Sequence, residues 1–188
     1  MIELKNISFS YGDLQILNNF SLTINNGEVV QLFGESGSGK TTVARIILGL
    51  ENIDSGNIVV PQKISVVFQE DRLLENFDIQ KNVRLVLKKE QYTFADSLLK
   101  EFGLYNIRKK KVSELSGGMK RRVALIRAIA YGGDALVLDE PFNGLDLENK
   151  RVASAIIKRE YTDKNKPVLL ISHIEEDGKL LNSNKISI

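Results

Sequence analysis

The sequence predicts an α/β fold whose core is a mainly parallel β-sheet. Short segments of continuously apolar residues alternate along the chain with segments whose apolar residues recur at helical spacing. Continuously apolar strands are typical of a sheet that helices cover on both faces, as parallel sheets require. A glycine-rich turn also joins one such strand directly to a helix, as expected of the strand–helix alternation in an α/β fold.

The N-terminal half of the chain is expected to contain strands and one helix. Residues 2–9 alternate apolar and polar, and residues 20–32 hold two apolar segments around an Asn-Asn-Gly-Glu turn. A helix is expected after the glycine-rich turn, because the apolar residues of 43–50 have helical spacing. Residues 54–69 predict two short strands, with Pro61 in the connection between them.

The C-terminal half is expected to contain a helical region followed by buried strands. Residues 71–112 are charged and have a helical period. Residues 114–131 predict a helix that begins after Ser116 as N-cap and ends at a glycine pair. The apolar segments 135–141 and 167–173 predict two strands that are covered on both faces.

Length and composition fit one globular domain over residues 1–188, with a helical subdomain at about 71–131. The 43% apolar content of the 188 residues excludes intrinsic disorder. The net charge of +2, from 26 Lys+Arg against 24 Asp+Glu, argues against a nucleic-acid binder recognised by charge alone. The sequence has no cysteine, which excludes disulfides, thiolate metal sites and a cysteine nucleophile. The single histidine, His173, excludes a multi-histidine metal centre.

The sequence predicts a cytoplasmic location. Charged residues interrupt the N-terminal segment 1–13, so it does not resemble a secretory signal. No uncharged run approaches the ~18–20 residues that a membrane helix needs. Any association with a membrane is therefore expected to depend on a partner.

The segment Gly34–Thr41, with the sequence GESGSGKT, is the strongest functional signal. It matches the phosphate-binding pattern G-x-x-x-x-G-K-[ST] and lies between an apolar strand and a helix. Its glycines allow backbone amides to surround a triphosphate, while Lys40 adds charge and the Thr41 hydroxyl binds Mg²⁺. A glycine-rich turn with an incidental lysine is the alternative, which the strand–helix context disfavours.

Two acidic residues, Asp139 and Glu140, follow the apolar segment at 135–138. The carboxyl ends of strands in open α/β sheets are where ligands bind. A carboxylate at Asp139 can hold Mg²⁺, and Glu140 can reach a water molecule in line with the terminal phosphate. An ordinary acidic pair at a strand end is the alternative, which the glycine-rich segment makes improbable.

Residues 115–119, with the sequence LSGGM, predict a second anion-binding helix N-terminus. Ser116 can cap the helix, and the two glycines that follow leave its backbone amides accessible. Taken alone, the segment fits a plain capped helix after a flexible loop better than an anion site.

The combined motifs resemble those of the ATP-binding cassette family, the nucleotide-binding subunits of ABC transporters. GESGSGKT is similar to the Walker A motif, LSGGM to the signature and LVLDEP to Walker B, in the family's order. Gln69 resembles the Q-loop glutamine, Asp146 the D-loop aspartate and His173 the H-loop histidine. Tyr11 matches the aromatic residue on which adenine stacks. The resemblance implies a P-loop ATPase fold of ABC type, with an antiparallel N-terminal β subdomain and a short helical subdomain.

The resemblance also implies residue roles in a head-to-tail dimer, formed by two copies of this chain or by two different cassettes. Glu140 would polarise the attacking water, and His173, Gln69 and Lys40 would complete the catalytic group. Asp146 would cross the dimer interface. The residues implied to bind ATP are Tyr11, Gly34, Glu35, Ser36, Gly37, Ser38, Gly39, Lys40, Thr41 and Thr42 of one chain, with Ser116, Gly117 and Gly118 of the second. The residues implied to hold Mg²⁺ are Thr41, Gln69 and Asp139.

The partners implied are transmembrane permease subunits, which would hold the chain at the inner face of the cell membrane. The predicted function is an ATPase that powers transport through these subunits. The alternative is a soluble ABC-type ATPase that remodels nucleic acid or ribosomes, disfavoured because the chain has one cassette and no long coiled coil. A regulator that binds nucleotide without hydrolysing it conflicts with the presence of both Glu140 and His173.

Several surface residues complete the predictions. Leu73, Leu74 and Phe77 are candidates for a groove that receives a permease helix, or for packing within the helical subdomain. The basic clusters 108–111 and 120–122 are expected to be solvated faces rather than a nucleic-acid site. Met119 stands where the family usually has glutamine, and the stretch from Gln69 to Ser116 is shorter than usual.

Overall fold

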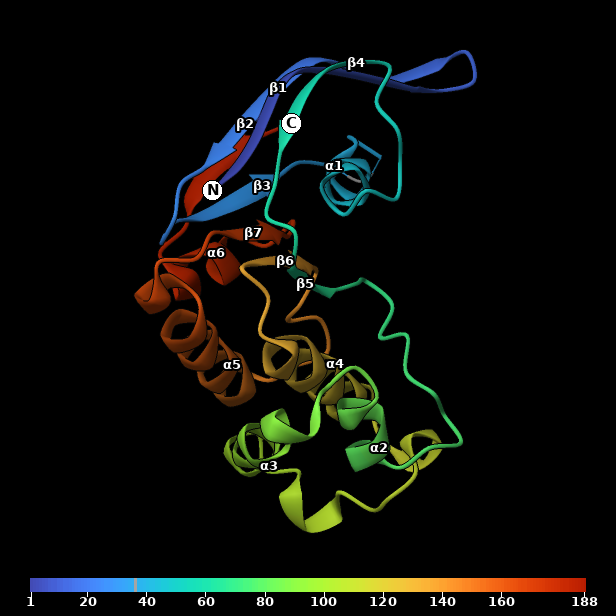
Figure 1. The fold of residues 1–188 in the computed structure, drawn as a ribbon, viewed down its shortest axis with the longest axis vertical. Helices are drawn as coiled ribbons and strands as arrows, with labels where there is room; N and C mark the ends of the chain where they lie inside the picture. Colours follow the sequence, from blue (N-terminus) through green and yellow to red (C-terminus); the bar gives the residue numbers. More distant parts are fainter. Residues whose placement is uncertain (36) are drawn as a thin grey trace.

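A five-stranded parallel sheet forms the centre of the computed structural model, which describes residues 1–35 and 37–188 (Figure 1). Its strand order is β5-β6-β7-β3-β8, and every neighbouring pair is parallel. The strands are β3 (Val29–Phe33), β5 (Ile64–Val67), β6 (Ala135–Asp139), β7 (Val168–Ile171) and β8 (Asn184–Ser187). The predicted strands at 135–141 and 167–173 and the predicted parallel sheet are confirmed.

A separate antiparallel sheet of three strands packs beside it, with the order β2-β1-β4. Its strands are β1 (Ile2–Tyr11), β2 (Leu14–Ile24) and β4 (Ser55–Val59). The predicted segment 20–32 therefore divides between two sheets, because the Asn25–Glu28 turn, closed by a 3.1 Å backbone hydrogen bond, separates β2 from β3. The strands on either side of Pro61 are β4 and β5, as predicted.

Helices cover the parallel sheet and form most of the end of the molecule opposite the antiparallel sheet (Figure 1). The α-helices are α1 (Lys40–Ile47), α2 (Ile79–Arg84), α3 (Tyr92–Glu101), α4 (Gly117–Tyr131), α5 (Leu147–Glu160) and α6 (Glu175–Leu181). The shorter 3₁₀ turns are η1 (Lys89–Gln91), η2 (Tyr105–Ile107), η3 (Val112–Glu114) and η4 (Thr162–Lys164). Among the described residues, no helix is both long and apolar enough to cross a membrane.

Two hydrophobic clusters, one on each face of the parallel sheet, account for its burial. Leu136 and Leu138 of β6 pack with α2 to α5, whereas Val137 packs with α1 and the antiparallel sheet. Because successive side chains of a strand point to opposite faces, a strand buried on both faces must be apolar throughout. This explains why β6 is continuously apolar up to its last residue, Asp139. That residue lies at the carboxyl end of the strand, beside α1.

Candidate functional site

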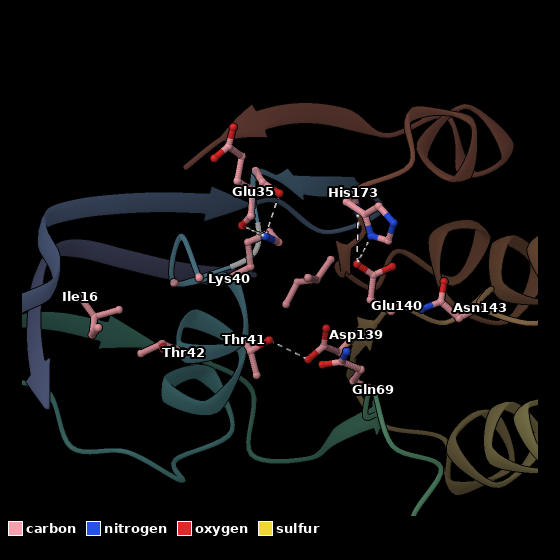
Figure 2. Close-up of a pocket in the computed structure, with 14 residues that line it drawn as sticks. Ile16, Glu35, Lys40, Thr41, Thr42, Gln69, Asp139, Glu140, Asn143 and His173 are labelled. Carbon is pink, nitrogen blue, oxygen red and sulfur yellow. Dashed lines mark hydrogen bonds and ion pairs between the residues drawn. The ribbon is translucent and has the colours of Figure 1, made fainter.

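A cavity of about 630 Å³ opens at the carboxyl end of the parallel strands, beside the start of α1 (Figure 2). Residues from the glycine-rich turn, α1, the end of β6 and the segment after β7 meet there, although they are far apart in the sequence. The lining residues are Ile16, Gly34, Glu35, Gly37, Gly39, Lys40, Thr41, Thr42, Gln69, Asp139, Glu140, Asn143, Ile171 and His173. The structure thus brings most of the predicted nucleotide, metal and catalytic residues into one cavity.

The glycine-rich turn presents the N-terminus of α1 to this cavity. Gly37 and Gly39 have φ angles of 87° and 99°, a left-handed conformation that glycine adopts without strain. Gly39 is the N-cap of α1, and none of the described side chains caps this helix. The amides of the first turn are therefore left for a ligand, and the helix dipole favours an anionic one. Ser36, predicted to bind the same phosphates, lies outside the described residues.

Lys40 is folded back over the turn that precedes it. Its ammonium donates hydrogen bonds to the carbonyl oxygens of Gly34, at 2.9 Å, and Glu35, at 2.6 Å (Figure 2). It also lies 3.4 Å from the Ser38 hydroxyl, which places Ser38 beside the cavity although it does not line it. The side chain is largely buried, so a positive charge is held at the base of the anion site.

Thr41 and Asp139 approach each other across the cavity floor. The Thr41 hydroxyl donates to Oδ2 of Asp139 at 3.2 Å, and Gln69 lies beside this pair (Figure 2). Burial raises the pKa of the Asp139 carboxyl, and the Thr41 hydrogen bond opposes that rise. A hydroxyl, a carboxylate and an amide oxygen suit Mg²⁺, which takes oxygen ligands and keeps several from water and phosphate. The described residues hold no cluster of three His, Cys, Asp or Glu side chains, so a cation here would depend on this sparse set.

Glu140 and His173 form the opposite wall of the cavity. Oε1 of Glu140 lies 2.7 Å from Nδ1 of His173 and accepts the His173 backbone N–H at 3.3 Å (Figure 2). Oε2 of Glu140 is buried and has no hydrogen-bond partner among the described residues. Buried polar atoms are nearly always paired in folded proteins. The free oxygen therefore indicates a position for water or a polar ligand atom.

The predicted second anion site is not part of this cavity. Ser116 caps α4 by accepting the Met119 backbone N–H at 3.3 Å, and Ser116 and Gly117 are exposed. Gly118 packs so closely on Gly144 that an added Cβ would lie 2.7 Å from its carbonyl oxygen. Within the described part of the chain, the LSGGM glycines therefore lie outside the cavity that Lys40 lines.

Tyr11 does not line the cavity either. Its hydroxyl donates to Glu51 at 2.9 Å, and its ring packs edge-on against Phe9. Three lining residues, Ile16, Asn143 and Ile171, were not predicted as site residues. Ile16 belongs to an antiparallel strand whose position over the glycine-rich turn only the tertiary fold sets. Asn143 follows Glu140 closely enough that its proximity to the acidic pair was a usable signal.

One predicted solvated face is wrong at its central residue. Arg121 is only 5% exposed, and its carboxylate partner Asp71 lies 3.2 Å away. Its burial follows from its place on the inward side of α4, which a short run of basic residues does not reveal. Among the predicted groove residues, Leu73 packs against the core, whereas Leu74 and Phe77 are exposed. Asp146 caps α5 by accepting the Asn149 backbone N–H at 2.8 Å.

Comparisons with known proteins agree on one family. Residues 17–143 match the family model described as ABC transporter. The phosphonates import ATP-binding protein PhnC of Fusobacterium nucleatum is 32% identical, covering 100% of this chain and 88% of that protein. The aliphatic sulfonates import ATP-binding protein SsuB 1 of Rhodococcus jostii is 37% identical, covering 96% and 76%. A dimeric ATP-binding cassette in a post-hydrolysis state, bound to ADP and Pi, is 25% identical with a TM-score of 0.88, covering 100% and 94%.

Proposed function

The chain belongs to the ABC transporter family, and from that premise we propose that it binds and hydrolyses ATP to power import through separate membrane-spanning subunits. The observation that carries the proposal is the convergence of the α1 N-terminus, Lys40, Asp139 and Glu140 on one cavity. A helix N-terminus and an ammonium favour a polyphosphate, and a carboxylate with an unpaired oxygen favours a water molecule beside it.

The phosphates would bind to the amides of residues 37–42, at the start of α1. Lys40 would exchange its bonds to the neutral carbonyls of Gly34 and Glu35 for bonds to phosphate oxygens, in which both the donor and the acceptor are charged. Thr41, Asp139 and Gln69 would hold Mg²⁺, which neutralises phosphate charge when bound. Tyr11 does not line the cavity, so its proposed contact with the adenine would lie outside it.

Glu140 would accept the proton of the attacking water. Its Oε2 has no hydrogen-bond partner within residues 1–35 and 37–188, while its Oε1 is held by His173 through both the ring Nδ1 and the backbone N–H. The pair therefore fixes the carboxylate in one orientation and leaves one oxygen available. A base positioned in this way contributes about 10²–10⁴-fold to hydrolysis. His173, whose side chain is exposed, would also contact the terminal phosphate.

A second cassette would complete the site. Ser116 and Gly117 are exposed and do not line this chain's own cavity, which supports a role for them at the nucleotide of another chain. The dimeric cassette to which this chain is similar supports the arrangement. Bound ATP then stabilises the dimer, and hydrolysis releases it. Permease subunits would use this cycle and hold the chain at the inner membrane face, as the relatives' import names support.

The test is the dependence of ATPase activity on protein concentration. We expect activity per chain to rise as the purified protein is concentrated, because each site would need two chains. Light scattering with ATP should report dimers over the same range. Activity that stays constant per chain, together with a monomer at every concentration, would contradict the shared site. An absence of hydrolysis in correctly folded protein at all concentrations would contradict the ATPase itself.

A further inference from the structure

Two arginines of α4 hold the segment 68–72, which links β5 to the helical region. The Arg121 guanidinium donates to the carbonyl oxygens of Phe68 and Gln69, each at 2.7 Å. The Arg127 guanidinium donates to the carbonyl oxygens of Asp71 and Arg72, at 2.8 and 2.9 Å. We call these four hydrogen bonds the arginine clamp.

The segment 68–72 depends on this clamp because it belongs to no helix or strand. Among the backbone hydrogen bonds of the described residues, none is accepted by the four clamped carbonyls. The Arg72 side chain adds a contact with the Phe68 ring, at 3.7 Å from its centre. The position of the Gln69 backbone is therefore set mainly by Arg121.

Arg121 is built into the protein as a buried charge. It is 5% exposed and pairs with Asp71, whose carboxylate lies 3.2 Å from Nη1. Burial lowers the pKa of the Arg121 guanidinium, and the charges of Asp71, Asp139 and Glu140 oppose that shift. A guanidinium is the side chain suited to such a place, since its planar fork can bond two acceptors at once. The helix that carries it is anchored by buried apolar residues over most of its length.

Gln69 is the end of the clamped segment that enters the cavity. Its side chain lies beside Asp139, next to the Thr41 hydroxyl (Figure 2). The other end of the connection is α4, which starts with Gly117 after the Ser116 cap. One buried side chain thus joins a proposed metal-site residue to the helix that carries the LSGGM segment.

We propose that Arg121 is a positioning residue that sets the Gln69 side chain in the nucleotide cavity by holding the Gln69 backbone carbonyl against α4. The proposal rests on the proposed function of the cavity. Its sequence signal was hidden, because Arg121 stands within a run of basic residues at 120–122. Substituting a residue that orients a metal ligand without touching the metal changes the affinity of the protein for that metal by about 10–100-fold.

The test compares the affinity of a β,γ-imido ATP analogue with Mg²⁺ and with EDTA, measured by calorimetry. The ratio of the two affinities reports the Mg²⁺ site without any turnover. Gln69→Ala should lower this ratio severalfold, and Arg121→Met should lower it to a similar degree. The double variant should match Gln69→Ala alone, since two changes that act through one residue are not additive. Full additivity, or an unchanged ratio in Arg121→Met, would overturn the proposal.

Two further variants separate positioning from charge and from general stability. Arg121→Lys keeps the charge but offers one nitrogen for two carbonyls, so we expect a lowered ratio with a thermal midpoint near that of wild type. A wild-type ratio in Arg121→Lys would overturn the proposal even if Arg121→Met fails to fold. Arg122→Met is the matched control, because Arg122 binds the Phe102 carbonyl and not the clamped segment. If wild type itself does not bind the analogue, the proposed function fails instead.

Discussion

Two glycine-rich helix N-termini in the described part of the chain, at α1 and at α4, are built differently. None of the described side chains caps α1, and its first turn lines a cavity beside the largely buried Lys40. By contrast, α4 is capped by Ser116 and begins at an exposed part of the surface. The α1 N-terminus combines backbone amides without a side-chain cap, the charge of Lys40 and the wall of a cavity. The α4 N-terminus does not combine these three features.

The difference shows that a helix N-terminus can contribute to an anion-binding site in two ways. An uncapped N-terminus within a cavity can bind an anion alone, because the helix dipole and the lysine act in the same enclosed place. An exposed, self-capped N-terminus adds only a few donors and needs a ligand that is already held elsewhere. We therefore expect α1 to determine whether nucleotide binds, and α4 to determine whether a bound nucleotide joins two chains.

The largest effect is expected from Glu140→Gln, which should keep the α1 N-terminus of one chain and the α4 N-terminus of another together on one unhydrolysed ATP. The amide cannot accept a proton from water, so hydrolysis should fall by about 10²-fold or more, while the phosphate contacts of α1 persist. Steady-state phosphate release and size-exclusion chromatography with ATP should show slow turnover and an accumulated dimer. The matched control is Glu148→Gln, at an exposed acidic residue in the first turn of α5. Wild-type turnover in Glu140→Gln would remove this residue from the role of base.

A smaller effect separates the lysines in the first turns of the two helices. Lys40→Ala should weaken binding of the ATP analogue by about 10–100-fold, because a charged hydrogen bond contributes about 1.5–3 kcal/mol. Lys120→Ala should leave the affinity of the monomer unchanged, since Lys120 pairs with Glu75 at 2.9 Å. Calorimetry on dilute protein measures both. Equal losses of analogue affinity in the two variants would show that binding depends no more on the α1 lysine than on the α4 lysine.

Local sequence was informative about α1 and less so about the surroundings of both helices. The strand, turn and helix of 29–47 are set by apolar spacing and by glycines that must adopt positive φ, so their form follows from local residues. Ile16 reaches the cavity, and Tyr11 stays out of it, because of how two sheets pack. Arg121 was predicted to be solvated because a run of basic residues does not show on which side of the helix each of them lies. Contacts between distant segments were the part that could not be predicted.

The smallest effect, and the sharpest test of the comparison, is Ser116→Ala. Loss of the cap to the Met119 amide should destabilise the fold by about 1 kcal/mol, seen as a modest fall in the chemical denaturation midpoint. Analogue affinity in dilute protein should stay at the wild-type value, because Ser116 does not line this chain's cavity. In the Glu140→Gln background, however, the ATP-dependent dimer should weaken severalfold, since the serine would contact the partner's nucleotide. Ser113→Ala, an exposed serine just before α4, is the control. A loss of affinity in the monomer would place Ser116 in its own chain's site, and the distinction between the two helix N-termini would then fail.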